Sequence, residues 1–146
     1  MATRARIAVK VSEDTKVGNR EVKAGEIIHV YSHWDGYPSE KMPMLTKNYN
    51  TEAKAVELIS LGNISSLEAS CEKPEGHSFD NRIEGYSTFY ERDRGETQEG
   101  FEIGNWKKAR IQESFGYLFE NGKWTWISES YRVVTDIEKD EDSNTF

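Results

Sequence analysis

The fold class is decided by Tyr117-Leu118-Phe119-Glu120-Asn121-Gly122-Lys123-Trp124-Thr125-Trp126-Ile127, a stretch near the C-terminal end of this 146-residue chain. Both arms are rich in the aromatic and β-branched residues that are typical of strands. Between them, Asn121-Gly122 supplies the two left-handed positions that a type I′ turn requires. The stretch therefore predicts a β-hairpin with a two-residue loop.

Two strands are expected near the N-terminal end of the sequence. Residues 4–11 (RARIAVKV) alternate charged and apolar side chains, the pattern of a strand with one wet face. Residues 26–33 (EIIHVYSH) combine β-branched and aromatic side chains and predict a second strand. The polar residues 12–25 between them contain Gly18 and Gly25 and predict at least one turn. We expect the two strands to pair antiparallel through a hairpin or a short intervening strand.

Two helices are expected after the second strand. The first spans residues 41–48, which places Pro43 in the first turn, where a proline is tolerated. Thr51 is a good N-cap for the second helix, and Gly62 is a suitable residue just beyond its C-terminal end.

The remaining segments are shorter. They predict a loop over 65–81, a strand over 85–92, an exposed polar run over 93–100, a short helix within 103–114, an edge strand over 131–137 and an acidic, solvated tail over 138–146. Residues 1–137 then form a single domain. The expected fold is α+β: an antiparallel sheet with two helices inserted after the second strand and a C-terminal Asn-Gly hairpin.

Composition limits the environment and the partners of the protein. The net charge is −7, and residues 136–142 alone contribute five acids against one lysine, so the body carries only about −3. No basic face is visible, which makes binding to duplex nucleic acid unfavourable. No stretch approaches the roughly 20 apolar residues of a membrane span, and none resembles a signal peptide. The single cysteine, Cys71, fits a reducing compartment, so we expect a cytoplasmic protein without a membrane partner.

The leading candidate for a site is the turn His33-Trp34-Asp35-Gly36-Tyr37-Pro38, here called the HWDGYP turn. It places an imidazole, a carboxylate and two aromatic rings at the end of a strand, where ligand-binding loops are common. In the alternative interpretation it is a structural corner: Trp34 and Tyr37 anchor the core, Asp35 caps the turn, and Gly36 takes a positive φ.

A second candidate is Tyr90-Glu91-Arg92-Asp93-Arg94-Gly95-Glu96. If this segment is extended, Arg92 and Arg94 project to the same side, where they can grip a phosphate while Tyr90 stacks on a base. The alternative is a solvated strand end whose charges pair locally and contribute little energy.

Metal binding and covalent catalysis are weaker hypotheses. Cys71, His77 and Asp80, with His33, carry atoms that suit zinc, but their spacing is not that of a known zinc site. Nucleophilic catalysis by Cys71 requires His77 to lie beside it in space. The chain lacks a phosphate-binding loop, a dinucleotide-binding glycine pattern and a nucleophile elbow. We therefore expect no catalytic residue, metal or cofactor, and a binding protein is favoured over an enzyme.

Several ordered motifs resemble a known family. They are the HWDGYP turn, Tyr49-Asn50-Thr51, Leu61-Gly62-Asn63-Ile64-Ser65-Ser66-Leu67, Glu75-Gly76-His77-Ser78-Phe79-Asp80, Tyr90 to Glu96 and the C-terminal hairpin. Together they resemble small uncharacterised proteins of tailed bacteriophages and prophages, over most of the chain up to about Trp126. The chain departs from that pattern at Ser39-Glu40-Lys41-Met42-Pro43 and in its longer 12–25 segment.

The resemblance implies a phage context and no particular chemistry. It suggests an accessory protein that binds a host protein in the host cytoplasm and inhibits or redirects it, in counter-defence or host takeover. His33, Trp34, Asp35, Tyr37, Tyr90, Arg92 and Arg94 are the residues we expect to contact a ligand or partner. One alternative function is a sponge that sequesters a nucleotide immune signal through Arg92 and Arg94. Another is a small hydrolase or nucleotide-modifying enzyme with His33 and Asp35 as its acid/base pair.

Overall fold

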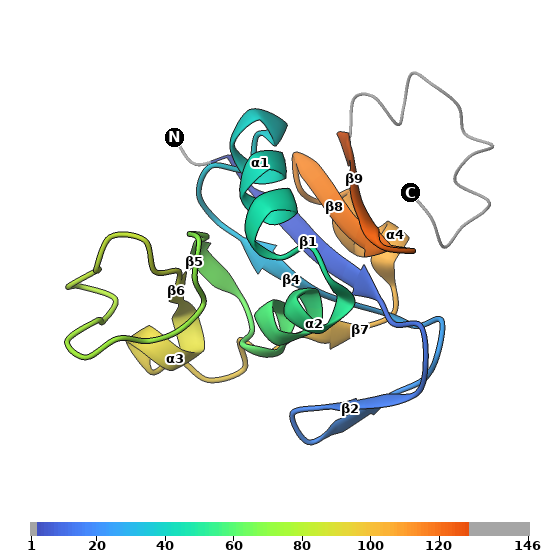
Figure 1. Cartoon of the computed structure of the whole chain (residues 1–146), viewed down its shortest axis with the longest axis horizontal. Coiled ribbons are helices and arrows are strands. Elements are labelled where there is room, and N and C mark those ends of the chain that lie inside the picture. Colours follow the sequence, from blue (N-terminus) through green and yellow to red (C-terminus); the bar gives the residue numbers. More distant parts are fainter. Residues whose placement is uncertain (1–2, 129–146) are drawn as a thin grey trace.

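The computed structural model describes residues 3–128 and combines helices with one large, mostly antiparallel sheet, as expected for an α+β fold (Figure 1). Its strand order is β6-β5-β4-β1-β8-β9, and β7 also pairs with β4. The strands are β1 (Ala5–Lys10), β2 (Thr15–Val17), β3 (Arg20–Val22), β4 (Ile27–Ser32), β5 (Ile64–Ser66), β6 (Thr88–Phe89), β7 (Glu102–Ile103), β8 (Phe115–Glu120) and β9 (Lys123–Ser128). The helices are α1 (Pro38–Asn48), α2 (Glu52–Ser60), α3 (Tyr90–Arg94) and α4 (Trp106–Arg110). The edge strand and tail predicted over 131–137 and 138–146 lie outside the described residues.

The N-terminal half of the sheet forms as predicted. Strands β1 and β4 pair antiparallel, with Ala5 opposite Ser32 and Lys10 opposite Ile27. Strands β2 and β3 form a separate two-stranded hairpin between them. The C-terminal hairpin is also confirmed: Glu120 pairs with Lys123, and both Asn121 (φ 54°) and Gly122 (φ 83°) are left-handed.

The prediction of a wholly antiparallel sheet is wrong at two places, because β1 pairs with β8 and β4 pairs with β5 in parallel. Parallel strands need a long crossover, and helices usually provide it. Between β4 and β5 the crossover is made by α1 and α2. Before β8, the chain passes through α4 and returns to the start of β1, where the Ser114 amide donates to the Arg4 carbonyl (3.2 Å). Strand β8 therefore starts at the same end of the sheet as β1.

The two faces of the sheet are covered unequally. The side chains of Ala5, Ile7 and Val9 belong to the main core, which α1 and α2 close with Leu45, Leu58 and their neighbours (Figure 1). On the opposite face, Ala8, Ile27 and Leu118 form a small second core under Trp106 of α4. At the start of β1, this second face carries the side chain of Arg6, and Lys10 lies at the other end of the strand.

Helix α1 begins at Pro38, three residues earlier than predicted, and α2 begins as predicted. Pro38 lies in the first turn, where no amide hydrogen is needed, and the amides of Glu40 and Lys41 donate to the Tyr37 carbonyl (both 2.9 Å). Pro43 is consequently inside the helix. In α2, the Thr51 hydroxyl accepts from the Lys54 amide (3.1 Å).

The region predicted as a strand over 85–92 differs most from expectation. Only β6 is extended, and the chain then turns into α3, which Gly95 ends with a φ of 77°. The cause is Asp93, whose carboxylate accepts from the Phe89 amide (2.8 Å) and stabilises the first turn of the helix. Asp93 is buried, so the prediction that 93–100 is exposed is wrong at that residue. The helix predicted within 103–114 is present as the shorter α4.

The HWDGYP turn is held by its backbone. The left-handed residue is Asp35 (φ 55°), not Gly36 as predicted. Gly36 is required by close approach: its amide donates to the Thr3 carbonyl (2.9 Å), and a Cβ built on it would lie 2.5 Å from that same oxygen. The Tyr117 hydroxyl donates to the Gly36 carbonyl. Trp34 (40% exposed) and Tyr37 (54% exposed) do not anchor the core, contrary to the structural interpretation of this turn.

We expect Gly36→Ala to destabilise the protein by about 1–3 kcal/mol, because its methyl group would displace the Thr3 carbonyl and the start of β1. Gly100→Ala is the matched control, because a Cβ there meets nothing within 4 Å, and we expect a change within about 0.5 kcal/mol. Denaturant unfolding measures both. Equal stability of the two variants would show that the contact of Gly36 with Thr3 does not constrain the fold.

Candidate functional site

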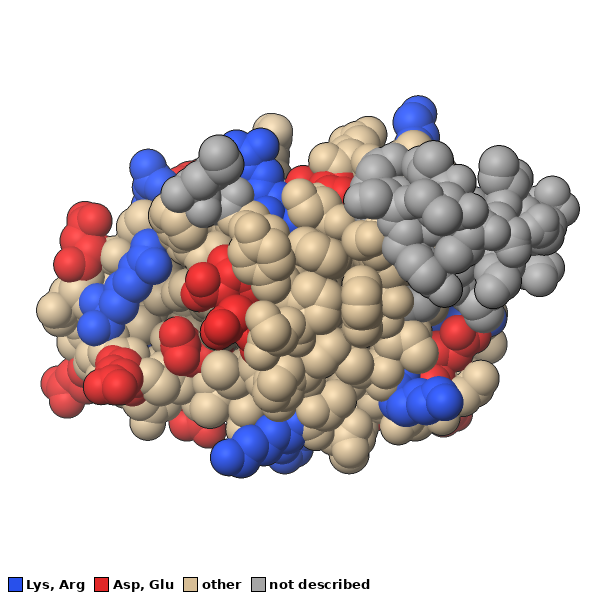
Figure 2. Space-filling view, turned by 90° about the horizontal axis from the view of Figure 1, so that it is seen from above, with Lys and Arg blue, Asp and Glu red and all other residues tan. Residues whose placement is uncertain are grey.

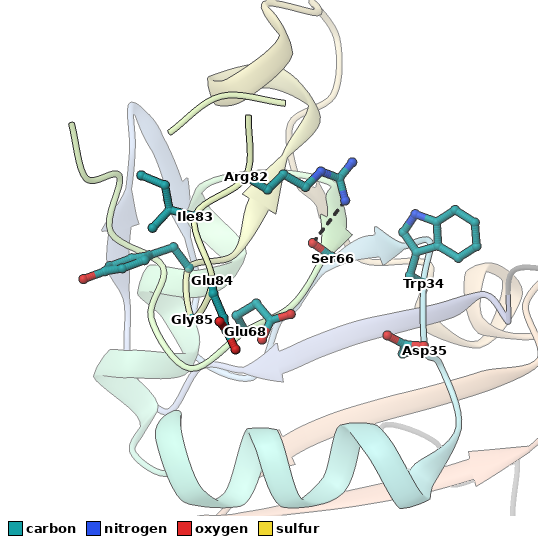
Figure 3. Close-up of a pocket in the computed structure, with 9 residues that line it drawn as sticks. Trp34, Asp35, Ser66, Glu68, Arg82, Ile83, Glu84 and Gly85 are labelled. Carbon is teal, nitrogen blue, oxygen red and sulfur yellow. Dashed lines mark hydrogen bonds between the residues drawn. The ribbon is translucent and has the colours of Figure 1, made fainter. Parts of the chain in front are cut away.

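A pocket of about 410 Å³ lies beside the HWDGYP turn (Figure 3). Trp34 and Asp35 come from the turn, and the rest of the wall comes from β5 and the loop that follows it. The full lining is Trp34, Asp35, Ser66, Glu68, Arg82, Ile83, Glu84, Gly85 and Tyr86. The pocket therefore joins the predicted turn to a loop segment, residues 82–86, that shows no site motif.

The turn places Trp34 and Asp35 on the pocket through extended pairing followed by a sharp bend. The amides of His33 and Trp34 donate to the carbonyls of Ile64 (3.0 Å) and Ser65 (3.1 Å), which prolongs the pairing of β4 with β5. The left-handed backbone of Asp35 then turns the chain away from the sheet. The Trp34 ring stays partly exposed and meets the His33 imidazole edge to face at 4.7 Å. Trp34 is thus a rigid aromatic wall that solvent still reaches.

Three carboxylates face this pocket. Figure 3 shows Asp35 and Glu68 on the side nearer to α1, with Trp34 and Arg82 on the other side. Burial raises the pKa of the Glu68 carboxyl, the negative charges of Asp35 and Glu84 raise it further, and Lys41 opposes them. Acidic side chains gather on the face seen in Figure 2, next to a broad uncharged surface. A further positive charge in the pocket would therefore stabilise the ionised form of Glu68.

Lys41 supports the turn from inside the protein. Its side chain is buried, with 2% of the residue exposed, and its Nζ donates to the Trp34 carbonyl (2.8 Å). Burial lowers the pKa of this amine to about 8, although Asp35, Glu68 and Glu40 favour its charged form. Lys41 thus reduces the negative charge beneath the pocket without lining it.

Arg82 is the one cation among the lining residues, and each of its three nitrogens already donates to a neighbour. Its Nε donates to the Phe79 carbonyl (3.0 Å), and its Nη2 donates to the Ser65 hydroxyl (3.2 Å). The guanidinium also lies over the Phe79 ring, 4.6 Å from its centre. These contacts fix Arg82 against the protein, so it forms part of the pocket wall.

Arg92 has a structural role. Its Nη1 donates to the Cys71 carbonyl (2.6 Å), its Nη2 donates to the Ser87 carbonyl (3.2 Å), and its Nε pairs with the Asp93 carboxylate (3.0 Å). Because Asp93 is buried and also accepts from the Phe89 amide, these groups join the loop after β5 to α3. Arg92 therefore positions the loop that lines the pocket.

The structure does not bring Arg92 and Arg94 together, because they lie on a helical turn and not on a strand. Arg94 pairs with Glu96 (3.0 Å) at the surface and lies over the Phe79 ring. Tyr90 also packs against Phe79, with their ring centres 5.6 Å apart. The geometry predicted for a phosphate grip by the two arginines is therefore wrong.

Tyr37 and His33 point away from the pocket lining. Tyr37 packs against Phe115 (ring centres 5.7 Å apart), which in turn meets Trp126 (6.0 Å). The His33 Nδ1 lies 2.6 Å from the Tyr31 hydroxyl. Of the seven residues predicted to contact a ligand, the structure places only Trp34 and Asp35 in the lining of this pocket.

Cys71, His77 and Asp80 do not assemble into a metal site, and no group of three or more potential ligands is found within residues 3–128. The ring nitrogens of His77 are engaged: Nδ1 accepts from the Ile83 amide (3.0 Å), and Nε2 lies 3.3 Å from the Thr88 hydroxyl. Burial raises the pKa of the Cys71 thiol, which disfavours the thiolate. Cys71 and His77 therefore lack the arrangement of a nucleophile and its base.

Sequence reasoning missed Glu68, which lies in the predicted loop, and Arg82 and Glu84, for which no element was predicted. No local pattern distinguishes these residues from other charged loop residues, and only the pairing of β4 with β5 brings them to Trp34.

Comparison of the chain with protein-family models, with curated proteins and with solved structures finds no match. Among residues 3–128, no helix is long and apolar enough to cross a membrane.

We expect the buried Lys41 amine to make stability depend on pH. Because its pKa is near 8 in the folded protein and 10.5 otherwise, the unfolded chain binds more protons between these values. The resulting penalty of about 3 kcal/mol is fully present below pH 8 and disappears as pH rises through 8 to 10.5. The unfolding free energy of the wild type should therefore rise relative to Lys41→Met over this range. If the difference in unfolding free energy between the wild type and Lys41→Met stays constant from pH 7.5 to 10.5, the lowered pKa of the buried amine is contradicted.

Proposed function

We propose that this protein is a non-catalytic binding protein that takes a positively charged side chain of a partner protein into the pocket beside Trp34. The observation that carries the proposal is the meeting of three carboxylates with a partly exposed tryptophan ring in one hollow. An arginine or lysine side chain satisfies both parts, because carboxylates accept its hydrogen bonds and the ring attracts its charge.

The charge balance supports a cationic ligand. The lining holds Asp35, Glu68 and Glu84 against Arg82, a net charge of −3 + 1 = −2, and Lys41 beneath it reduces this to −1. Arg82 cannot turn towards the carboxylates without leaving the Phe79 carbonyl and Ser65. A ligand cation can therefore reduce the repulsion that raises the pKa of Glu68. Cation–π contact with Trp34 contributes about 0.5–2 kcal/mol more.

The size of the pocket is sufficient for one inserted side chain. Its volume of about 410 Å³ is at the lower end of the range of about 300–1,000 Å³ for ligand pockets. Arginine and aromatic residues commonly dominate the binding energy of interfaces when they fill such pockets. The pocket would then receive the anchoring residue of a larger protein surface.

The resemblance to phage proteins gives the partner its expected source. On that basis the partner is a protein of the bacterial host, met in the host cytoplasm and inhibited or redirected by the contact. The lone cysteine supports a reducing compartment. Counter-defence is the expected setting of such an interaction.

The alternative functions have less support in the geometry. The nucleotide sponge relied on Arg92 and Arg94, and Arg92 is held by the Cys71 and Ser87 carbonyls. The acid/base pair of the hydrolase relied on His33 and Asp35, and the Nδ1 of His33 is occupied by the Tyr31 hydroxyl. Both proposals would need residues other than those that suggested them.

The proposal predicts that the side chain of arginine binds by itself. Titration with N-acetyl-arginine amide should shift the Trp34 indole NMR signals, with a Kd of about 1 mM or weaker, as expected for a single side chain. The neutral analogue N-acetyl-citrulline amide should have little effect. Glu68→Gln should weaken binding about tenfold, because one partner of the cation loses its charge.

Glu21→Gln is the matched control, since it removes one exposed carboxylate on the β2–β3 hairpin, outside the lining of the pocket. It should leave the arginine affinity unchanged. Equal responses to arginine and citrulline, or equal affinities of the two variants, would show that the pocket is not a cation site.

A further inference from the structure

A second group of polar side chains occupies the uncovered end of the sheet face that carries α4. It contains Arg4 and Arg6 from the start of β1, Tyr31 and His33 from the end of β4, and Glu113 from the segment after α4. We propose that these five residues, here called the sheet-end cluster, form a binding site for a phosphate group. The inference does not depend on the cation pocket.

Strand register builds the cluster. Arg6 pairs with Tyr31 across β1 and β4, and Ala5 pairs with Ser32, so the next position outward places Arg4 opposite His33. Alternate residues of a strand share a face, and these four therefore point away from the main core. Further along this face, Ala8 is covered by Trp106, whereas Arg4 is exposed. Solvent therefore reaches the cluster at Arg4, whereas Arg6 lies deeper.

The backbone around Arg4 is fixed from two sides. The Gly36 amide holds the Thr3 carbonyl, and the Ser114 amide holds the Arg4 carbonyl (3.2 Å). The second contact also places Glu113, the residue before Ser114, beside the arginines. The backbone of Arg4 is therefore set before any ligand binds, so binding has to order only its side chain.

Tyr31 orients the imidazole of His33. The two side chains meet at 2.6 Å between the hydroxyl and Nδ1, and the positive charge of Arg4 opposes the effect of burial on the pKa of the Tyr31 phenol. The phenol has one proton and two lone pairs, so it can donate to Nδ1 and still accept from a guanidinium, which can only donate. Burial raises the pKa of the Tyr31 phenol, and burial together with Arg4 lowers the pKa of His33. A neutral His33 then carries its proton on Nε2 and presents an N–H donor.

The arginines supply the charge. Arg6 is 8% exposed, its Nη2 pairs with Glu102 (3.0 Å), and its Nε has no hydrogen-bond partner within the described part of the chain. The Glu102 side chain is 58% exposed and can leave for solvent when a stronger anion arrives. Glu113 also interacts with both arginines, and burial raises the pKa of its carboxyl despite Arg6 and Arg4.

These donors suit a phosphate more than a carboxylate. Two guanidinium groups and an imidazole N–H can hydrogen-bond to several oxygens of a tetrahedral anion, and arginine forks match phosphate oxygens in pairs. The Trp34 ring lies beside His33, 4.7 Å away by ring centres. The same phosphate could therefore belong to a nucleotide whose base stacks on Trp34, or be free in solution.

The test uses the full-length protein and the NMR signals of its imidazoles. The chain has three histidines, and His29 and His77 are buried, so both serve as internal controls. We expect inorganic phosphate, at constant ionic strength, to shift His33 and to leave the other two unchanged. Adenosine 5′-monophosphate is the second probe. Tighter binding of the nucleotide that is lost in Trp34→Ala assigns the phosphate to a nucleotide, and equal affinities assign it to a free anion.

Arg4→Gln should reduce phosphate affinity at least tenfold. Its matched control is Lys16→Gln, which removes an exposed cation on the β2–β3 hairpin and should change nothing. Tyr31→Phe should weaken binding and also change the ¹⁵N shifts of His33, because Nδ1 loses its donor. An unchanged His33 with both probes would overturn the proposal. A His33 shift that survives in Arg4→Gln would overturn it as well.

Discussion

The fold depends on one close contact, in which the backbone of the HWDGYP turn hydrogen-bonds to the residue just before β1. Gly36 donates to the Thr3 carbonyl and accepts from the Tyr117 hydroxyl, and no side chain larger than hydrogen fits between Gly36 and that carbonyl. The contact ties β1, the end of β4 and β8 together at one end of the sheet. Since β1 lies between β4 and β8 in the sheet, every other pairing is built around this point.

The same turn separates two sites of opposite charge preference. His33 still follows the alternation of β4 and points to the face that carries arginines, whereas Trp34 and Asp35 line a pocket dominated by acids. The rings of His33 and Trp34 touch (4.7 Å between centres), so the two sites are direct neighbours. The buried amine of Lys41 lies behind this division and binds the Trp34 carbonyl. The two proposed ligands, a cation and a phosphate, therefore approach from different sides of one corner.

The elements set by local chemistry could be predicted from the sequence. The Asn121-Gly122 hairpin, the Thr51 cap of α2 and the antiparallel pairing of β1 with β4 follow from turn, capping and periodicity rules. The misplaced elements depend on distant partners. Asp93 turns a strand-like sequence into a helix because its carboxylate is buried with Arg92, and nothing in the local pattern shows that burial.

Only part of the candidate site could be predicted, again because the rest depends on residues that are distant in the sequence. Trp34 and Asp35 were found because an unusual cluster of residue types follows a strand, whereas Glu68 and Glu84 lie in ordinary loop sequence. Gly36 was identified as special but for a φ value that Asp35 has instead. Steric exclusion by the Thr3 carbonyl is a property of the folded chain and leaves no signal in the sequence around the glycine.

The parallel pairing of β1 with β8 has a consequence for how the chain is made. Ala5 and its partner Phe115 are separated by about 110 residues, so the ribosome delivers the first strand long before its neighbour exists. Until β8 emerges, Ile7 and Val9 can be covered on the β4 side only. Until β8 has been synthesised, one side of β1 has no strand partner. Contacts between such distant residues form slowly, and the central pairing of the sheet cannot form before the C-terminal hairpin has been synthesised.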